Sequence, residues 1–423
     1  MVPIQLWAAF KSSKGLIKNI QGGHTATYQD EKSGAFYNFG IQTFIDYGGA
    51  RKFVERFNIT TGTLPRVSLN RTYVDFETGK VVKDYIPPPT NDSSAALNKY
   101  TELARQYADY LAPGFWNFPE PGDIPEDLSM PFSDFVAKYK LEAMVPAIFE
   151  ITVMGLGDPM PVPTMYVMQA FGAPIQGSGS FNPISGNNME LYQKIEKLLG
   201  ADVRLNSIIG DSRRSDDGVE LVVIDLISQT ATLVKAKRLL IAFEPVSSNM
   251  NFLDTDDQEM AVFNKWEWTD VQCGIVKHSS LPVGVSLDNT PQAAAPRNYL
   301  ELPKMPFVAR YDWMGQDYFR ILMVGDKAYN EWKSLNQMDS TVKRMLKTDE
   351  ERDEDVTLVA FMDHGPMHLH VGTEELKKGF IQDQYALQGL RSTWYTGAAW
   401  SMQFTTVLWE FNEVLLPKLL KGL

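Results

Sequence analysis

A short run near the C-terminus holds the residues whose types and spacing could bind a metal. Asp363, His364, His368 and His370 follow an H-x-x-x-H-x-H spacing, in which several imidazole nitrogens could act as ligands. Pro366 argues against one regular helix that would present two of these imidazoles on one face. We therefore expect a loop that enters a strand and predict no metal site. A structural role and a polar wall of a substrate pocket are the two alternatives.

Signatures of nucleophilic, metallohydrolase and phosphoryl-transfer catalysis are absent from the sequence. It contains no G-x-S-x-G, no P-loop, no H-E-x-x-H and no kinase motif set. A complete G-x-G-x-x-G loop is also missing, since the stretches that begin at Gly155 and Gly177 lack a third glycine. No catalytic residue can be named from motifs. Cofactor chemistry needs no nucleophile, but a protein without enzymatic activity fits equally well.

Composition limits the classes of partner. The chain has 423 residues, 44% of them hydrophobic, which is more than one hydrophobic core usually supports. Its net charge of -12 argues against nucleic acid as a partner. Cys273 is the single cysteine, so an intrachain disulfide is excluded, and we expect it to be a small buried apolar residue. No segment is apolar enough to predict a membrane span.

The first ten residues lack a basic region before their short apolar stretch, so no signal peptide is predicted. A cytoplasmic location is slightly preferred, and the sequence leaves the localisation and the oligomeric state open.

Hydrophobic periodicity places the main elements. Residues 23–49 predict two short strands joined by a turn at 31–34, followed by a helix from about Tyr47. Apolar residues at helical spacing predict helices over 97–111 and 134–139, in a proline-rich helical region. Residues 191–199 predict a helix that ends at Gly200, and a strand is expected over 202–209. A hairpin over 219–234, a buried strand over 238–243 and a last helix over 401–420 follow. We expect that helix to pack on the segment formed early in the chain.

Two segments carry a resemblance to a known family. The residues from Gly22 to Tyr28 and from Tyr37 to Gln42 resemble the segment after the second strand in flavin-containing amine oxidoreductases. The tail from Arg391 to Trp400 is similar to the segment that closes the flavin site in a fungal branch related to cyclopiazonate dehydrogenase and polyunsaturated fatty acid isomerase. The resemblance covers nearly the whole chain from Gly22 onward, and it implies FAD as the cofactor.

The resemblance also implies which residues bind FAD: Gly22, Gly23, His24, Gln42, Val203, Gly397, Ala398 and Ala399. It places Gly397 and the N–H groups after it against the flavin, at a helix N-terminus whose partial positive charge stabilises a reduced flavin. Val203 would contact the adenine through its backbone.

Several of these residues also have a plain structural explanation. His24 could lie beside the cofactor or simply pack, and Gln42 could face the flavin ring or be a hydrogen-bonded core amide. Trp394, Tyr395 and Trp400 could form an apolar wall over the flavin or only fill volume. For Gly397 a backbone argument exists, because close approach of a ring to the main chain excludes a Cβ.

The sequence departs from the family before Gly22. Relatives would carry a strand, the glycine-rich loop and its helix there, whereas Lys18 and Asn19 stand where an acidic residue is expected. We therefore expect a truncated or misannotated start, and a dinucleotide-binding unit that is incomplete at its N-terminus.

The expected fold is α/β, with an FAD-binding Rossmann-like domain interleaved with a helical and mixed-sheet substrate domain. Residues 1–60, 175–250 and 380–423 form the first domain, and residues 61–174 and 251–379 form the second. The expected function is FAD-dependent oxidation of a small apolar metabolite by hydride transfer, with isomerisation as a variant. The alternative is a degenerate homologue without FAD that serves as a binding protein or a cofactor-free enzyme.

Overall fold

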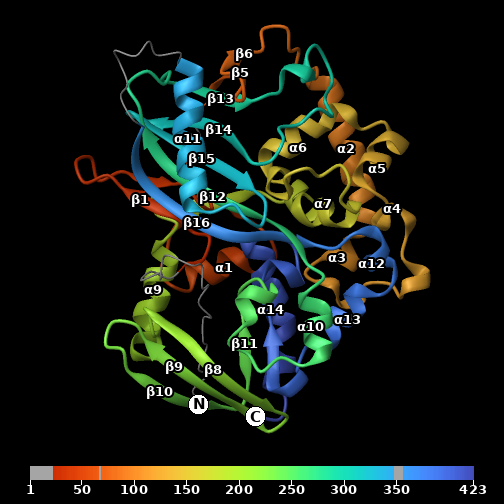
Figure 1. Cartoon of the computed structure of the whole chain (residues 1–423), viewed down its shortest axis with the longest axis vertical. Coiled ribbons are helices and arrows are strands. Elements are labelled where there is room, and N and C mark those ends of the chain that lie inside the picture. The colour runs from red at the N-terminus through yellow and green to blue at the C-terminus, as the bar shows by residue number, and fades with distance from the viewer. Residues whose placement is uncertain (1–21, 66–67, 347–355) are drawn as a thin grey trace.

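The computed structural model describes residues 22–65, 68–346 and 356–423. Figure 1 shows a large sheet with a helical layer in its upper part, and smaller sheets with several helices in its lower part. The expected break in the dinucleotide-binding unit, with Lys18 and Asn19, falls before residue 22 and lies outside the described residues.

The largest element is a mixed sheet of seven strands in the order β16-β12-β15-β14-β13-β5-β6. Only β13 and β5 are parallel neighbours, and the other pairs are antiparallel. The strands are β5 (Asn70–Asp75), β6 (Lys80–Val81), β12 (Glu267–Lys277), β13 (Val285–Asn289), β14 (Phe307–Gly315), β15 (Tyr318–Gly325) and β16 (Thr357–His370).

Side chains alternate between the two faces of this sheet, so each face has its own core. Phe319, Ile321 and Met323 of β15 point to one face, where α11 (Glu331–Leu346) covers them. Tyr318 and Leu322 point to the other face, which carries the helical layer and an N-terminal hairpin. The functional groups described below lie on this second face, between the sheet and the rest of the chain.

Prolines start most helices of the helical layer. Pro89, Pro125, Pro131 and Pro163 each stand at the N-cap, where a missing N–H costs no helical hydrogen bond. The helices are α2 (Thr90–Gln106), α3 (Ala108–Leu111), α4 (Glu126–Ser129), α5 (Phe132–Tyr139), α6 (Val145–Ile151), α7 (Thr164–Ala170) and α8 (Ala173–Gln176). The two helices predicted here correspond to α2 with α3, and to α5.

The N-terminal hairpin follows the prediction closely. It consists of β1 (Thr27–Gln29) and β2 (Phe36–Asn38), and the turn between them is held by Asp30, whose Oδ1 accepts a hydrogen bond of 2.7 Å from the Ser33 N–H. Hydrogen bonds from Ser33 and Tyr318 hold the pKa of Asp30 well below its usual range. Because Tyr318 belongs to β15, this turn also ties the hairpin to the sheet.

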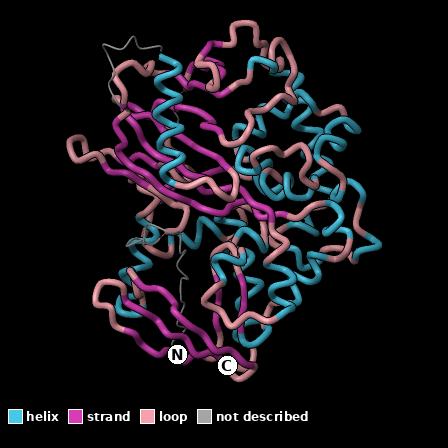
Figure 2. The backbone as a smooth tube through the Cα atoms, in the orientation of Figure 1, coloured by secondary structure: helices cyan, strands magenta, loops and turns pink. Residues whose placement is uncertain are grey.

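Three small sheets make up the lower part of the molecule (Figure 2). The meander is formed by β8 (Ser207–Ser215), β9 (Gly218–Asp225) and β10 (Ala231–Ala236). A parallel pair joins β11 (Leu239–Ile241) to β17 (Thr393–Tyr395). The third sheet contains β3 (Phe44–Ile45), β7 (Ser180–Pro183) and β4 (Thr61–Gly62).

The helices of the lower part are α1 (Ala50–Glu55), α9 (Glu190–Leu199), α10 (Asp257–Phe263), α12 (Thr373–Lys377), α13 (Phe380–Ala386) and α14 (Thr405–Leu420). The helix predicted over 191–199 is α9. The last helix packs where it was expected, since the Trp409 ring of α14 lies 5.7 Å from Phe44 and 4.8 Å from Phe53.

Two boundaries were predicted wrongly. The strand expected over 202–209 begins only at Ser207, because Gly200–Asp202 continues α9 as a 3-10 turn, η5. The histidine segment, expected as a loop entering a strand, lies wholly within β16. Since β16 is an edge strand with register shifts, it tolerates a proline that cannot donate to a neighbour.

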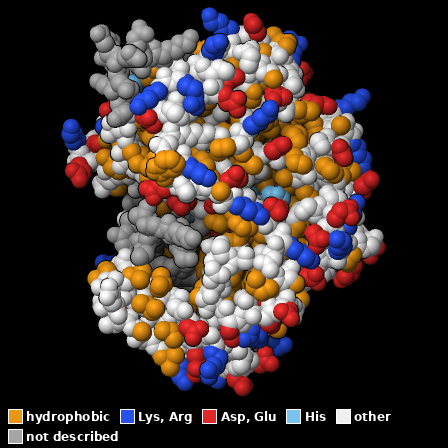
Figure 3. Space-filling model, in the orientation of Figure 1, with side chains coloured by type: hydrophobic (Ala, Val, Ile, Leu, Met, Phe, Trp, Pro, Cys, Tyr) orange, Lys and Arg blue, Asp and Glu red, His pale blue; other side chains and the backbone are white. Residues whose placement is uncertain are grey.

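None of the described helices combines the length and the apolar character that crossing a bilayer requires. On the face drawn in Figure 3, basic and acidic side chains of the described residues are interspersed rather than gathered into an extended basic patch.

Candidate functional site: a cofactor turn beside a histidine and cysteine cluster

The candidate cofactor turn follows β17 directly. The Thr396 N–H donates to the Ile241 carbonyl at 2.8 Å, which extends the parallel pairing by one residue. Gly397 then adopts φ 119° and ψ 179°, a conformation essentially restricted to glycine. Ala398–Trp400 form a short 3-10 turn, η9, before α14 begins. A Cβ built on Gly397 would meet its nearest described atom only at 3.9 Å, so the protein leaves space beside this backbone.

Buried glutamines hold the carbonyl groups of this turn. Gln169 of α7 donates from Nε2 to the Ala398 carbonyl at 2.8 Å, and also to the Ser401 carbonyl. Gln384 of α13 donates to the Ala399 carbonyl at 2.7 Å. Gln388 pairs with both backbone groups of Tyr395. These side chains were missed by the sequence analysis, because no motif or spacing distinguishes them from other glutamines.

The first turn of α14 is suited to an electron-rich group. Its N-cap residue, Phe404, provides no side-chain hydrogen bond, so the first N–H groups of a 16-residue helix receive no side-chain cap. The Thr406 hydroxyl in this turn is buried and has no hydrogen-bond partner among the described residues. A helix N-terminus carries about half a positive charge, which favours an anionic ligand atom. The uncapped turn, the orphaned hydroxyl and the space beside Gly397 therefore fit a flavin.

The paired glycines before the hairpin form a tight turn. Gly22 has φ 116° and Gly23 has φ 56°, and the Thr25 N–H donates to the Gly22 carbonyl at 2.9 Å. This turn places the half-buried His24 ring 4.7 Å from the ring of His364.

His364 also contacts the only cysteine. Its Nε2 lies 3.0 Å from Sγ of Cys273, a fully buried residue of β12. We call His24, His364 and Cys273 the His–Cys cluster. The burial predicted for Cys273 is confirmed, but its thiol contacts an imidazole and is therefore more than an apolar filler. The cluster joins the glycine turn to the large sheet, and β16, which carries His364, also packs against the turn at 398–400.

The other two histidines of the segment face different surroundings. His368 packs against Gly155, where any Cβ would collide with its ring. The Nδ1 atom of His370 lies 2.7 Å from the His368 carbonyl, and its ring lies 5.9 Å from that of Tyr166. The three imidazoles therefore do not converge, and within the described ranges no group of three or more His, Cys, Asp or Glu side chains could hold a metal ion.

The remaining predicted residues lie apart from the cluster. Gln42 is in the connection before β3 rather than at a strand end. Its side chain is exposed, so it is not a core amide, and its carbonyl accepts from Asn182. Val203 is half-buried between η5 and β8. Tyr395 and Trp400 are buried and stack on each other at 4.9 Å, so their rings fill the core.

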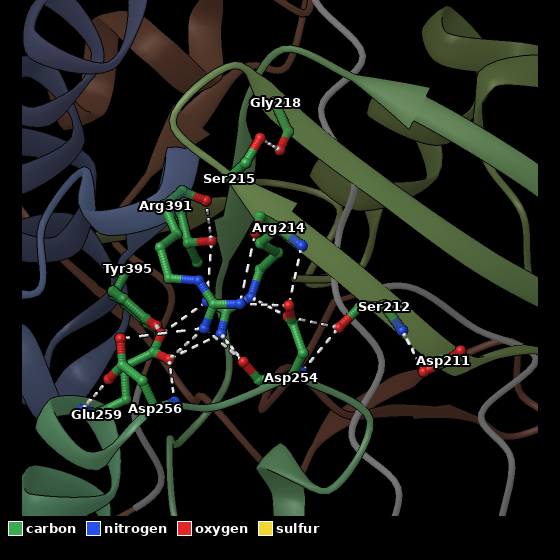
Figure 4. Close-up of polar contacts among 11 residues, drawn as sticks. Asp211, Ser212, Arg214, Ser215, Gly218, Asp254, Asp256, Glu259, Arg391 and Tyr395 are labelled. Carbon is green, nitrogen blue, oxygen red and sulfur yellow. Dashed lines mark hydrogen bonds and ion pairs between the residues drawn. The ribbon is translucent and has the colours of Figure 1, made fainter.

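A buried ion-pair network fixes the strand that leads into the cofactor turn (Figure 4). Arg214 of β8 contacts both carboxylate oxygens of Glu259, at 2.6 and 2.7 Å, and Asp254 at 2.8 Å. Tyr395 donates to Glu259 at 3.0 Å, and Arg391 contacts Asp254. Burial opposes the charge of Arg214, but the hydrogen bonds that it donates to Glu259 and Asp254 outweigh burial and raise the pKa of the guanidinium.

The network therefore links the meander, α10 and the segment just before Gly397. Sequence analysis missed it, because the partners are up to 179 positions apart and belong to no shared motif.

Comparison with solved structures identifies the class of fold. The chain is similar to a fatty acid isomerase from P. acnes, with a TM-score of 0.67 and 18% identity over 95% of this chain and 91% of that chain. It is also similar to putrescine oxidase, with a TM-score of 0.60 and 12% identity over 95% of this chain and 92% of that chain. The expected α/β architecture is confirmed, and the fold is the one shared by FAD-dependent amine oxidases and this isomerase.

Comparison with curated proteins identifies the family. The chain is 32% identical over 406 residues to beta-cyclopiazonate dehydrogenase of Aspergillus oryzae, covering 95% of this chain and 86% of that protein. It is also 32% identical over 417 residues to the FAD-dependent oxidoreductase pigF of Monascus ruber, covering 96% of this chain and 86% of that protein. No family model matches the chain. The protein belongs to the family of fungal FAD-dependent oxidoreductases that includes beta-cyclopiazonate dehydrogenase.

The ion-pair network yields a stability prediction. Replacing Arg214 by Met leaves Glu259 buried without its bidentate partner, which we expect to lower the free energy of unfolding by about 3–5 kcal/mol. The neighbouring Arg213 is exposed on the same strand, and Arg213→Met is expected to change it by less than about 0.5 kcal/mol. Urea unfolding checks both values, and equal shifts in the two variants would show that the network contributes little.

We expect the free energy of unfolding to fall at acidic pH because of His368. Burial, together with the charge of His370, lowers the pKa of His368 from 6.5 to about 3. Below pH 6.5 the unfolded chain binds a proton that the folded chain excludes until about pH 3, so stability falls as the pH falls through this window. Between pH 7.5 and pH 5 this residue should account for a loss of about 2 kcal/mol in the free energy of unfolding.

The His368→Asn variant tests this prediction, because asparagine tolerates the positive φ of this position and does not titrate. Its loss of stability between the two pH values should be smaller than that of the unchanged protein by the stated amount. His278→Asn, outside β16, is the control. If the His368→Asn variant loses as much free energy of unfolding between pH 7.5 and pH 5 as the unchanged protein, His368 is not the cause of the acid sensitivity.

Proposed function

We propose that the protein binds FAD at the Gly397 turn and oxidises a small, largely apolar metabolite by hydride transfer. FAD, when bound, supplies the hydride acceptor. The observation that carries this proposal is the uncapped N-terminus of α14 with the buried, unpartnered Thr406 hydroxyl, a few residues after a turn that favours glycine. Gly397, Ala398 and Ala399 would hold the flavin from this side, with the carbonyls of Ala398 and Ala399 already accepting hydrogen bonds from glutamines.

The other candidate residues receive roles within the same proposal. Gly22 and Gly23 would let the backbone approach the cofactor, while His24 would place its ring at the flavin side of the His–Cys cluster. Val203 would meet the adenine through its backbone, and Gln42 would face the flavin ring. The exposed side chain of Gln42 is free to do so.

The candidate cofactor residues all fall in three ranges of the chain. We assign FAD binding to residues 1–60, 175–250 and 380–423, and substrate binding to residues 61–174 and 251–379. The His–Cys cluster contains residues from both sets of ranges, because His24 belongs to the first set and Cys273 and His364 belong to the second. The buried Cys273 and His364 would exclude water from the reacting atoms and orient the substrate against the cofactor.

Two alternatives differ in their support. A redox-neutral isomerisation uses the same site, and the similarity to a fatty acid isomerase with a TM-score of 0.67 favours keeping it as the second candidate. A degenerate binding protein without FAD is not favoured, since the curated relatives named above include FAD-dependent oxidoreductases that align over nearly the whole chain.

The test of FAD binding is the visible absorption spectrum of the purified chain, before and after refolding in excess FAD. We expect a flavin band that survives desalting. Gly397→Ala should weaken FAD binding by about tenfold or more, because it introduces both backbone strain and a Cβ into the free space beside the turn.

Gly122→Ala is the matched control, since a Cβ at Gly122 meets nothing within 4 Å and its φ is not positive. A folded protein that stays colourless in excess FAD would refute the proposal. Equal FAD affinity of the Gly397→Ala variant would refute the role of the turn.

A second prediction concerns the glutamines that hold the turn. Gln384→Leu removes the donor to the buried Ala399 carbonyl, and we expect a loss of about 1–3 kcal/mol in the free energy of unfolding together with weaker FAD retention. Gln193→Leu, at an exposed position of α9, should change neither quantity. Unchanged FAD retention in a folded Gln384→Leu variant would show that the turn keeps its shape without this contact.

A further inference from the structure

A pocket at the outer end of the large sheet has no role in the function proposed above. It lies between α6 and the ends of β5, β13 and β14, which neighbour one another in Figure 1. Three tyrosines and three acidic side chains line it: Tyr73, Tyr85, Tyr299, Glu150, Asp288 and Glu301. The Tyr73 and Tyr85 rings meet edge to face at 4.8 Å. None of the three tyrosine hydroxyls is hydrogen-bonded to another described residue.

Positive charge near this pocket is already engaged. The Arg310 Nε lies 2.9 Å from Asp312, and its Nη1 donates to the Glu150 carbonyl at 2.7 Å. Arg71 contacts both Glu150 and Asp288. Both guanidinium groups therefore already lie within ion-pair distance of the protein's own acids, which lowers the attraction of the pocket for a carboxylate ligand.

Negative charge, in contrast, is in excess. Three guanidinium groups face four carboxylates, namely Arg71, Arg310 and Arg320 against Glu150, Asp288, Glu301 and Asp312. The half-buried Glu301 has no ion-pair partner among the described residues. A ligand that neutralises the pocket must therefore carry a positive charge.

Ser286 hydrogen-bonds two carboxyl groups at this end of the sheet. Its hydroxyl oxygen lies 2.8 Å from Oδ1 of Asp288 and 2.6 Å from Oδ1 of Asp312. Burial raises the pKa of Asp288, whereas the charges of Arg310 and Arg320 outweigh burial and hold the pKa of Asp312 low.

An apolar layer lies between the pocket and β12. Phe149 and Met154 line the pocket, and both are buried in one cluster with Val271 of β12. Val271 is two residues from Cys273, so both side chains point to the same face of the sheet. Packed side chains therefore separate the pocket from the His–Cys cluster, and the pocket is a site of its own.

We propose that this pocket is a binding site for an organic cation, that is, for a protonated or quaternary nitrogen. Tyrosine rings attract such cations, and the excess carboxylate stabilises them. The inference goes beyond the proposed oxidoreductase function, and the binding itself requires no flavin.

The test compares choline with its neutral isostere 3,3-dimethyl-1-butanol by titration calorimetry on the full chain. We expect choline to bind about tenfold more tightly or better, since only choline gains the cation–π and charge contributions.

Variants of residues that line the pocket test whether choline binds there. Glu301→Gln and Tyr85→Leu should each weaken choline binding about fivefold or more and leave the alcohol unaffected, while Tyr85→Phe keeps the ring face and should retain binding. Glu77→Gln, an exposed position that does not line the pocket, is the control. Melting temperatures identify any variant that does not fold. The choline affinity of the other, folded variant then tests the site.

Equal affinity for choline and the alcohol, or choline binding unchanged in a folded Glu301→Gln or Tyr85→Leu protein, would overturn the cation site. A protein that binds choline as expected but never takes up FAD would overturn the proposed function instead.

Discussion

The buried pairing of Arg214 with Glu259 is the constraint on which the rest of the cofactor side depends. Both side chains are fully withdrawn from solvent, so each would be costly without the other. Because Tyr395 donates to the same carboxylate, the pair fixes the strand from which the Gly397 turn emerges. Three segments distant in sequence, from β8, α10 and β17, thus meet at one point. The contacts among these three segments therefore set the position of the Gly397 turn relative to β11.

The turn itself has its carbonyls and its amides in different surroundings. Its carbonyls accept hydrogen bonds from Gln169 and Gln384, so they are turned toward the protein. The following helix begins without a side-chain cap, so its first N–H groups remain available for a ligand. The space at Gly397 and the partial positive charge at the start of α14 are the physical basis of the proposal that a flavin binds here.

The large sheet has a different organisation, since polar groups lie on both sides of an apolar layer. On the inner side, His24 contacts His364, which in turn lies against the buried Cys273. On the outer side, tyrosines and carboxylates line a pocket whose guanidinium groups lie beside carboxylates. Between them, Phe149 and Val271 belong to one apolar cluster.

Sequence alone determined the elements whose signals are local. The turn at residues 31–34, the helical face of α9 with its glycine stop, and the apolar spacing of α14 were all readable, because helix and hairpin periodicity involve neighbours only a few positions apart. The resemblance of residues 22–28 and 391–400 to flavoenzymes likewise lies in contiguous residues.

Only the tertiary structure decided which distant side chains meet. Nothing local placed His364 on an edge strand against Cys273, and nothing local marked Gln169 or Gln384 as partners of the tail. Pairings such as Arg214 with Glu259 depend on how the chain folds back over tens to hundreds of residues, and no periodicity in the sequence records that geometry.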